Sequence, residues 1–344
     1  MINISAERLQ QIVEKVFVGA GAPVGSARQV STSLVENNLV GHDSHGVLRV
    51  DSYVQALDSG RVDPHGVPTI RRESATTALI DGGCNFGQIV ACQAMDLAMK
   101  KARAHDIGMV ALRNCGHTGR IGEYVVRAAQ GGFMGLAFGS GSARGGAVAP
   151  YMGTSRVFNT NPIAWGVPAG AHPPVFMDYA TSAASWGKIR AAVDKGVSIP
   201  EGWLLNADGR PTTDPRDQQR GGIMLPFGQH KGYGILFMVE ALSGGLTGVS
   251  CAALDSYKSE FAMVLMAVNI EAFQPLEQFC AMMDELIVAT KAARKAPGAE
   301  EILVPGEIEW KTREQRLRDG IDVPEAAWER IVEAGAAHGV TVTL

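Results

Sequence analysis

The stretch FMGLAFGSGSARG, residues 133–145, decides which kind of fold the chain can have. Its apolar segment, Phe133–Phe138, runs straight into a glycine-rich loop, as a strand does in a doubly wound dinucleotide-binding fold. However, Arg144 occupies the position of the third glycine in the G-x-G-x-x-G pattern, and Pro150 interrupts the helix that would receive a pyrophosphate. The other glycine cluster, Gly19–Gly21, follows a predicted helix instead of a strand. A dinucleotide, if one binds, is therefore not held by the usual fingerprint.

Helical and strand patterns alternate on both sides of this stretch. Apolar spacing predicts helices over a segment that Ser5 caps and Gly19–Pro23 breaks, then over Ser26–Leu39, Gln88–His105, Ile121–Gln130, Gly232–Leu246, Leu276–Arg294, Lys311–Arg318 and Pro324–Ala337. Short apolar runs predict strands at Met109–Leu112, Phe133–Phe138, Val175–Met177 and Met263–Val268. The mixture indicates an α/β protein whose helical ends pack together.

The composition indicates two packed units and excludes several classes of protein. The 344 residues exceed the ~250–300 at which a single core stops growing. A hydrophobic content of 46% and a charged content of 19% argue against disorder. The net charge of −4, with its signs interspersed, provides no basic footprint for nucleic acid. No apolar run reaches the ~20 residues of a membrane span, and the first residues lack the pattern of a signal peptide.

The number and spacing of the cysteines indicate the redox state of the compartment in which the protein works. All 5 are scattered and none forms a CxxC pair. This pattern is typical of a reducing cytoplasm and predicts neither a disulfide scaffold nor a metal site.

The polar loop His42–Arg49 is the first of four segments that could carry chemistry. His45 stands four residues before Arg49, so one side chain could exchange a proton while the other clamps a carboxylate in a bidentate fork. A turn whose side chains only satisfy backbone groups explains these residues equally well.

The second segment, Arg113–Gly122, connects a predicted strand to a predicted helix. A helix N-terminus favours an anion such as a phosphate, and Arg120 would reinforce that preference. His117 in the same loop is either a functional group or a capping or core histidine.

The third and fourth segments each place a charge at the end of an element. Asp178 follows the predicted strand Val175–Met177, a common place for a catalytic acid, although it could also cap a helix starting at Ala180. Lys231 stands at a predicted helix start, where the helix dipole disfavours a cation, so a bound phosphate or carboxylate would stabilise it. An exposed lysine that tolerates the dipole is the alternative.

Together these segments resemble the malate/L-lactate dehydrogenase family of nicotinamide-dependent oxidoreductases, which is distinct from the Rossmann-type enzymes of the same names. The resemblance lies in GHDSHGVLRV (41–50), RNCGHTGRIGEY (113–124), NTNPIAWGVP (159–168), DYATSAASWGK (178–188), LPFGQHKGYG (225–234) and VPGEIEWKTREQR (304–316). HDSHG, GRIG and DYATS make the chain most similar to bacterial hydroxycarboxylate dehydrogenases within that family.

The resemblance implies a fold that periodicity does not reveal. Residues 76–299 would form a non-Rossmann cofactor-binding and catalytic domain on a largely antiparallel sheet. Residues 1–75 and 300–344 would form a helical domain for substrate binding and dimerisation. The family implies a homodimer with the site near its interface.

The resemblance also implies roles for individual residues. His45 would be the catalytic acid/base, supported by Asp178, with Ser44 beside it and Arg49 holding the substrate carboxylate. His117, which matches the histidine favoured in the ureidoglycolate branch, ranks second as proton carrier. The implied cofactor contacts are His45, Gly119, Arg120, Ile121, Ser140, Met177, Asp178, Tyr179, Ala180, Lys231, Gly306 and Glu307.

Two departures from the family affect the pocket. Many relatives carry Asn-His or His-His where this chain has Gly116-His117, and the loop Ser140–Ala149 is longer than in several relatives. Arg144 in that loop and Arg120 are both available to a 2′-phosphate, so NAD is favoured only modestly over NADP.

The implied reaction is hydride transfer between NAD(P) and C2 of a 2-oxo or 2-hydroxy acid. The same clamp and hydride donor would serve the reduction of a cyclic imine such as piperideine- or pyrroline-2-carboxylate. Oxidation of ureidoglycolate is a third possibility. A non-catalytic nucleotide sensor is the alternative from another class, although a sensor has no need of His45, Asp178 and Arg49 together.

Overall fold

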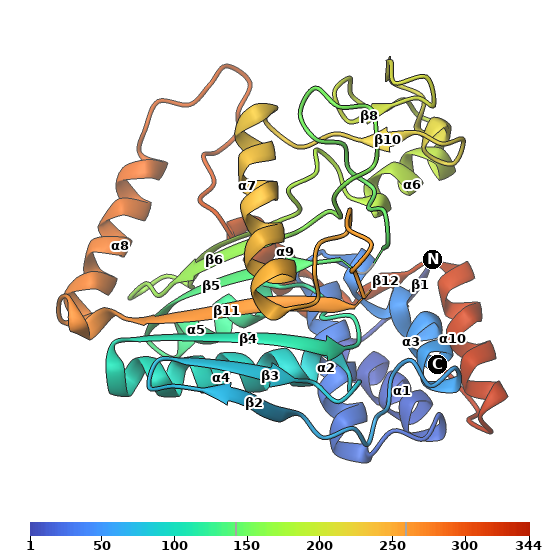
Figure 1. Ribbon diagram of the computed structural model, residues 1–344, viewed down its shortest axis with the longest axis horizontal. Helices are drawn as coiled ribbons and strands as arrows, with labels where there is room; N and C mark the ends of the chain where they lie inside the picture. Colours follow the sequence, from blue (N-terminus) through green and yellow to red (C-terminus); the bar gives the residue numbers. More distant parts are fainter. Residues whose placement is uncertain (142, 259) are drawn as a thin grey trace.

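A seven-stranded sheet organises the protein in the computed structural model, which describes residues 1–141, 143–258 and 260–344 (Figure 1). The strand order is β2-β3-β4-β11-β5-β6-β7. Every neighbouring pair is antiparallel except β3 and β4, which run parallel. The strands are β2 (Thr69–Glu73), β3 (Thr77–Asp81), β4 (Ile107–Cys115), β5 (Phe133–Ser140), β6 (Ile163–Val167), β7 (Val175–Tyr179) and β11 (Phe261–Asn269). The expected largely antiparallel sheet is thus confirmed.

Two helices, α4 (Gly87–His105) and α5 (Gly122–Gln130), cover one face of this sheet. Alanines on α4 allow a close approach, and a Cβ at Gly108 of β4 would lie 1.9 Å from the Ala98 carbonyl oxygen. In Figure 1, α7 (His230–Glu240) and α8 (Leu276–Lys291) stand on the opposite side of the sheet. Small residues therefore set the helix–sheet distance on the covered face.

The two ends of the chain share a second core, as the apolar patterns predict. β1 (Ile2–Ile4) pairs antiparallel with β12 (Ile321–Val323). The helices α1 (Ala6–Gly19), α2 (Val24–Leu39), α3 (Val50–Asp58) and α10 (Glu325–Ala337) surround one cluster of buried apolar side chains. The domain division at residues 75 and 300 stays a prediction, and β2, before the first boundary, pairs with β3 in the large sheet.

A small lobe follows β7, and no pattern in the sequence predicts it. It contains α6 (Trp186–Lys195), which Ser185 caps, and the short strands β8 (Leu204–Leu205), β9 (Pro211–Thr212) and β10 (Ile223–Met224). Strands of two residues are too short to show an alternating pattern. The lobe has its own core, which Phe158, Ile189 and Leu236 help to form.

Several predicted boundaries are wrong in ways that affect the site. β7 continues to Tyr179, so Asp178 lies inside a strand and pairs with Ala164 of β6 instead of following the strand's end or capping a helix. The helix predicted at Gly232–Leu246 begins at His230 and ends at Glu240, where a π-helical turn replaces it. α9 starts at Glu307 and runs to Asp319, so it is longer at its N-terminus than Lys311–Arg318.

The other elements lie close to their predicted ranges. β5 extends to Ser140, opposite Ala262 of β11, and the described residues of the loop that follows form no helix, which agrees with the failed fingerprint. Ser142 of the glycine-rich loop lies outside the described residues. Among the described residues, no helix combines the length and the apolar character that a membrane crossing requires.

Candidate active site

The loop that carries His45 is held by a side chain from α2. Asn38 donates to Asp43 Oδ1 over 2.6 Å and accepts the Val47 N–H over 2.8 Å. Gly46 lies against this amide, and a Cβ there would be 2.2 Å from Asn38 Oδ1. From α9, Arg316 donates to both oxygens of Asp43. The loop, two short 3-10 turns at Asp43–His45 and Val47–Arg49, is therefore anchored from both ends of the chain.

His45, Ser44 and Arg49 form a compact group on this loop. The Ser44 hydroxyl lies 3.1 Å from His45 Nδ1, and Arg49 Nε donates to the Ser44 carbonyl over 2.8 Å. Burial, followed by the charge of Arg49, lowers the pKa of His45 to about 3. His45 is thus neutral at neutral pH. Among the described residues, no carboxylate lies within 4.0 Å of Arg49, so none of them neutralises its charge.

The structure brings His117 beside His45. The two rings are nearly parallel, 17° apart, with centroids separated by 5.6 Å. The Tyr53 hydroxyl lies 2.8 Å from His117 Nδ1, and the Gly119 N–H donates to the same nitrogen over 3.3 Å. Burial lowers the pKa of His117 well below its ordinary value. His117 thus belongs to the same cluster of side chains as His45.

Arg120 and Asp178 meet at the N-terminus of α5. Arg120 is 6% exposed, its Nε donates to Asn37 Oδ1 over 3.0 Å, and its Nη1 has no partner among the described residues. Asp178 Oδ2 accepts the Gly122 N–H over 2.7 Å. Burial raises the pKa of Asp178, although the charge of Arg120 opposes that effect. A buried guanidinium with an unpartnered nitrogen is a strong site for an anion.

The expected support of His45 by Asp178 is not a direct contact. In the part of the chain that the structure describes, the Asp178 carboxylate is more than 4.0 Å from either His45 ring nitrogen. Asn37 connects His45 to Arg120 instead, because it donates to the His45 carbonyl over 3.1 Å and accepts from Arg120 Nε over 3.0 Å. Ser44, not Asp178, contacts the His45 ring.

Another pair joins this loop to α9. His42 Nε2 lies 3.2 Å from Glu309 Oε1. Burial raises the pKa of Glu309, but the hydrogen bond with His42, a backbone hydrogen bond and the positive charges nearby together outweigh burial, and the net shift of the pKa is downward. This pair lies close enough to Asp178 for the charge of each partner to affect the Asp178 pKa.

The remaining residues expected to contact a cofactor lie on neighbouring elements. Tyr179 of β7 packs edge-on against Phe227, and the Phe227 N–H donates to the Thr181 carbonyl, so the segment leading to Lys231 lies beside the end of β7. Lys231 is exposed in the first turn of α7, and no carboxylate lies within 4.0 Å of it among the described residues. Ser140 is buried at the end of β5, with its hydroxyl 3.5 Å from the Ala262 carbonyl.

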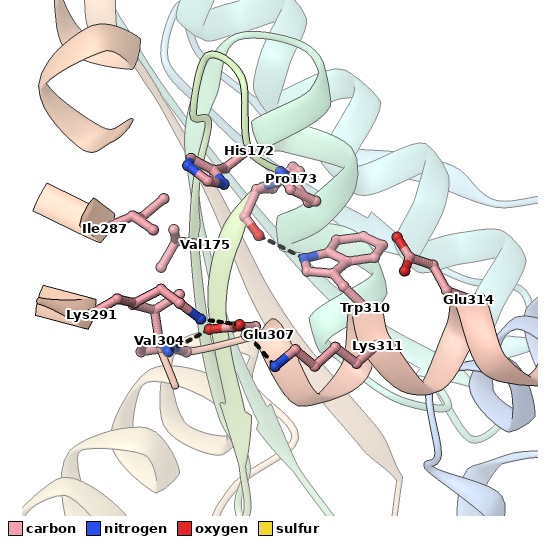
Figure 2. A pocket seen from close by; sticks show the side chains of 12 residues that line it. His172, Pro173, Val175, Ile287, Lys291, Val304, Glu307, Trp310, Lys311 and Glu314 are labelled. Atoms are coloured by element: carbon pink, nitrogen blue, oxygen red, sulfur yellow. Dashed lines mark hydrogen bonds and ion pairs between the residues drawn. The ribbon is translucent and has the colours of Figure 1, made fainter. Parts of the chain in front are cut away.

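Gly306 and Glu307 form the N-terminus of α9, beside a cavity of about 250 Å³ (Figure 2). Gly306 has φ of +88°, and a Cβ there would lie 2.7 Å from the Phe176 ring. Figure 2 shows the Glu307 carboxylate between Lys291 and Lys311. Although burial opposes it, hydrogen bonds from these lysines and the Val304 N–H lower the pKa of Glu307 to about 2. Groups of the protein itself therefore neutralise the Glu307 carboxylate and provide its hydrogen bonds.

Sequence reasoning missed the residues that hold the two histidines. Asn37, Asn38 and Gln88 are buried on α2 and α4, and Tyr53 is buried on α3. The sequence feature that could have identified them is a polar residue on a helix face that is otherwise apolar. Such a residue needs a buried hydrogen-bond partner, which marks it as structural or functional.

Comparisons with known proteins agree over the whole length of the chain. The family model described as malate/L-lactate dehydrogenase matches residues 4–332. Malate dehydrogenase of Pyrococcus abyssi is 37% identical over 98% of this chain and 96% of its own length. Hydroxycarboxylate dehydrogenase B of Escherichia coli K12 is 34% identical over 98% of this chain and 95% of its own length, in line with the resemblance read from HDSHG, GRIG and DYATS.

Solved structures show the same fold. Malate dehydrogenase of Entamoeba histolytica superimposes with a TM-score of 0.94 at 28% identity, covering 100% of this chain and 99% of that one. Δ1-piperideine-2-carboxylate reductase of Pseudomonas syringae superimposes with a TM-score of 0.85 at 28% identity, covering 97% of this chain and 100% of that one. These similarities extend over both the sheet and the helical ends.

Proposed function

The chain belongs to the malate/L-lactate dehydrogenase family, and on this premise we propose that it transfers a hydride between NAD(P) and C2 of a 2-oxo or 2-hydroxy carboxylic acid. Its relatives are dehydrogenases, so the chain is an oxidoreductase. The observation that carries the proposal is the pairing of His45 with the unpartnered charge of Arg49 on one anchored loop. Together they provide a proton exchanger and a carboxylate clamp.

The residues around Arg120 fit a dinucleotide cofactor. The unpartnered Nη1 of Arg120 and the N-terminus of α5 suit a phosphate group, and Lys231 offers a second cation on a neighbouring element. Gly119, Ile121, Met177, Tyr179 and Ala180 flank these groups and complete the proposed contacts, with Ser140, Gly306 and Glu307 further along the neighbouring elements. When bound, the nicotinamide supplies or accepts the hydride. NAD is the first choice, and NADP stays a candidate because Arg120 and Arg144 could both meet a 2′-phosphate.

The proton chemistry falls to His45. Because its pKa is low in the ligand-free protein, His45 is unprotonated, as the removal of a proton from a 2-hydroxy acid requires, but it becomes an effective base only when its pKa rises. In the reductive direction His45 must hold a proton. A substrate carboxylate on Arg49 would cancel the charge that is the second cause of the low pKa, and thereby raise it. Ser44 at Nδ1 orients the ring and leaves Nε2 for the substrate.

A cyclic imine such as piperideine-2-carboxylate is the second candidate substrate. The reductase of Pseudomonas syringae, with its TM-score of 0.85, favours this option. An imine carboxylate would use the same clamp and the same proton exchanger. The two reactions differ in whether the carbon that receives the hydride is double-bonded to oxygen or to nitrogen. Arg49 and His45 alone do not discriminate between these two substrates.

We also propose that the chain forms a homodimer. α8 carries Met282, Leu286 and Val288 with 49%, 56% and 60% of each side chain exposed, and only Ile287 of this helix is buried. Exposed apolar residues at this density on one helix are typical of an interface. A cytoplasmic location, predicted from the scattered cysteines, completes the proposal.

A screen of substrates tests the function. NADH and NADPH are offered in parallel with a panel of 2-oxo acids and cyclic imino acids, and the loss of reduced-nicotinamide absorbance is followed. Turnover of an oxo acid that falls by roughly 10²–10⁴ in His45→Gln supports the proposal. Turnover confined to imines replaces it with the second candidate. Bound nucleotide without turnover of any member favours a sensor or a substrate outside the panel.

A further inference from the structure

The hydrogen bonds of His117 define which of its nitrogens carries the proton. Nδ1 faces two groups, the Tyr53 hydroxyl at 2.8 Å and the Gly119 N–H at 3.3 Å. A backbone N–H can only donate, so Nδ1 must be the acceptor and the proton of the neutral ring must be on Nε2. Gly119 can aim its N–H this way because it has φ of +70°, which favours glycine.

The Tyr53 hydroxyl is oriented by Gln88. Gln88 Nε2 donates to the Tyr53 oxygen over 2.8 Å, which leaves the hydroxyl hydrogen for His117 Nδ1. The reverse orientation of the amide would draw that hydrogen towards Gln88, but the Gly119 N–H still requires an unprotonated Nδ1. Burial raises the pKa of Tyr53, so the phenol keeps its proton throughout the working pH range.

This chain of groups is part of the core and is therefore held rigidly. Tyr53 is 7% exposed and packs against Phe17 and Phe86, and Gln88 is fully buried. Phe261 touches the His117 ring edge-on, with centroids 5.2 Å apart. Among the described residues, the Nε2 atoms of His117 and His45 have no hydrogen-bond partner. Each imidazole thus presents Nε2 to a ligand while protein groups contact Nδ1.

We propose that Tyr53, oriented by Gln88, is a positioning residue that holds His117 as the neutral Nε2–H tautomer, so that His117 donates a hydrogen bond to the substrate oxygen while His45 carries the proton. The inference rests on the proposed function and adds a division of labour between two neighbouring histidines. Two adjacent imidazolium ions would repel each other, and a neutral donor beside a proton carrier avoids that repulsion. Tyr53 acts through His117 and does not touch the substrate.

The tautomer can be measured without any substrate. In protein labelled with ¹⁵N-histidine, nitrogen–proton correlation spectra distinguish Nε2–H, Nδ1–H and imidazolium forms. His117 should be Nε2–H from pH 5 to 8, and the Nδ1 resonance should move towards that of a free acceptor in Tyr53→Phe. An Nδ1–H or imidazolium form of His117 near neutral pH overturns the proposal, whatever reaction the protein catalyses.

Kinetics test the role of His117 once a substrate is found. In His117→Gln, the side-chain oxygen can accept from Tyr53 and Gly119, while the amide N–H replaces Nε2–H and no proton can be carried. Its kcat should stay within about tenfold of wild type, whereas His45→Gln loses roughly 10²–10⁴. A loss in His117→Gln as large as in His45→Gln overturns the proposal.

Tyr53→Phe should lower kcat/KM by about threefold to tenfold, the usual effect of one hydrogen bond. Because Tyr53→Phe keeps the aromatic ring, the variant should still fold, and its thermal unfolding temperature checks this. Tyr151→Phe, at an exposed site, and His65→Gln, also exposed, are the matched controls. Equal kinetics of Tyr53→Phe and wild type, with an unchanged Nδ1 resonance, would exclude a positioning role for the hydroxyl. If no substrate is found, the spectra alone decide.

Discussion

Gly122→Ala should damage the site without removing any chemical group from it. Gly122 is the first residue of α5, and its N–H donates to Asp178 Oδ2. An added Cβ would lie 2.6 Å from Arg120 Nη1 and 2.8 Å from Asp178 Oδ2. Ordinary contact requires about 3.5 Å, so the two groups must separate from the methyl by roughly 0.7–0.9 Å.

Neither group can move away at little cost. Arg120 is buried, with its Nε held by Asn37, and Asp178 lies within β7. A misplacement of about 1 Å can reduce turnover by about 10², so we expect a loss of roughly 10- to 100-fold in kcat/KM and weaker nucleotide binding. Overpacking of this kind also lowers the free energy of unfolding by about 1–3 kcal/mol.

The measurement combines steady-state turnover, nucleotide titration by calorimetry and urea unfolding. Gly25→Ala is the matched control, because Gly25 is an exposed α2 residue whose Cβ would meet nothing within 4 Å. That variant should be unchanged in turnover and more stable by up to ~1 kcal/mol. If Gly122→Ala instead keeps wild-type turnover and nucleotide affinity, the Arg120–Asp178 geometry is not what binds the cofactor.

Three further outcomes are expected. The pKa of His45 is about 3 in the folded protein against about 6.5 when unfolded, so the unfolded chain binds more protons between these values and wild type loses stability as the pH falls from 7 to 4. Urea unfolding of His45→Gln should show a loss of folding stability between pH 7 and pH 4 that is smaller than that of wild type by about 1–2 kcal/mol, a value reduced because His45 is partly exposed. The same dependence of stability on pH in the two proteins would contradict the lowered pKa. Leu286→Lys on α8 should convert the dimer to a monomer in light scattering, whereas Val67→Lys, at another exposed site, should not; a monomeric wild type would contradict the interface. Arg49→Met should raise the KM for the acid by about 10-fold or more with little change in nucleotide affinity, and an unchanged KM would place the clamp elsewhere.

Local patterns in the sequence were sufficient for most of the individual helices and for the longer strands of the sheet. The spacing of Leu9, Ile12, Val13, Val16 and Phe17 defines α1, because a helix places such positions on one face. Arg144 and Pro150 argue against the usual dinucleotide-binding fingerprint by simple backbone chemistry. The order of strands was not accessible in this way, since pairings such as β11 with β4 and β5 join segments far apart in the chain.

The residues of the candidate site also fall into those that the sequence indicates and those that only the tertiary structure brings in. Residue types and spacing made His45, Arg49 and Arg120 candidates, because a clamp, a proton exchanger and an anion site each need a particular side chain on a polar loop. Only the tertiary structure placed Tyr53 at His117 Nδ1 and separated Asp178 from the His45 ring. Those relations depend on the direction of side chains from elements that are distant in sequence, and that direction is set by packing, which no local pattern records.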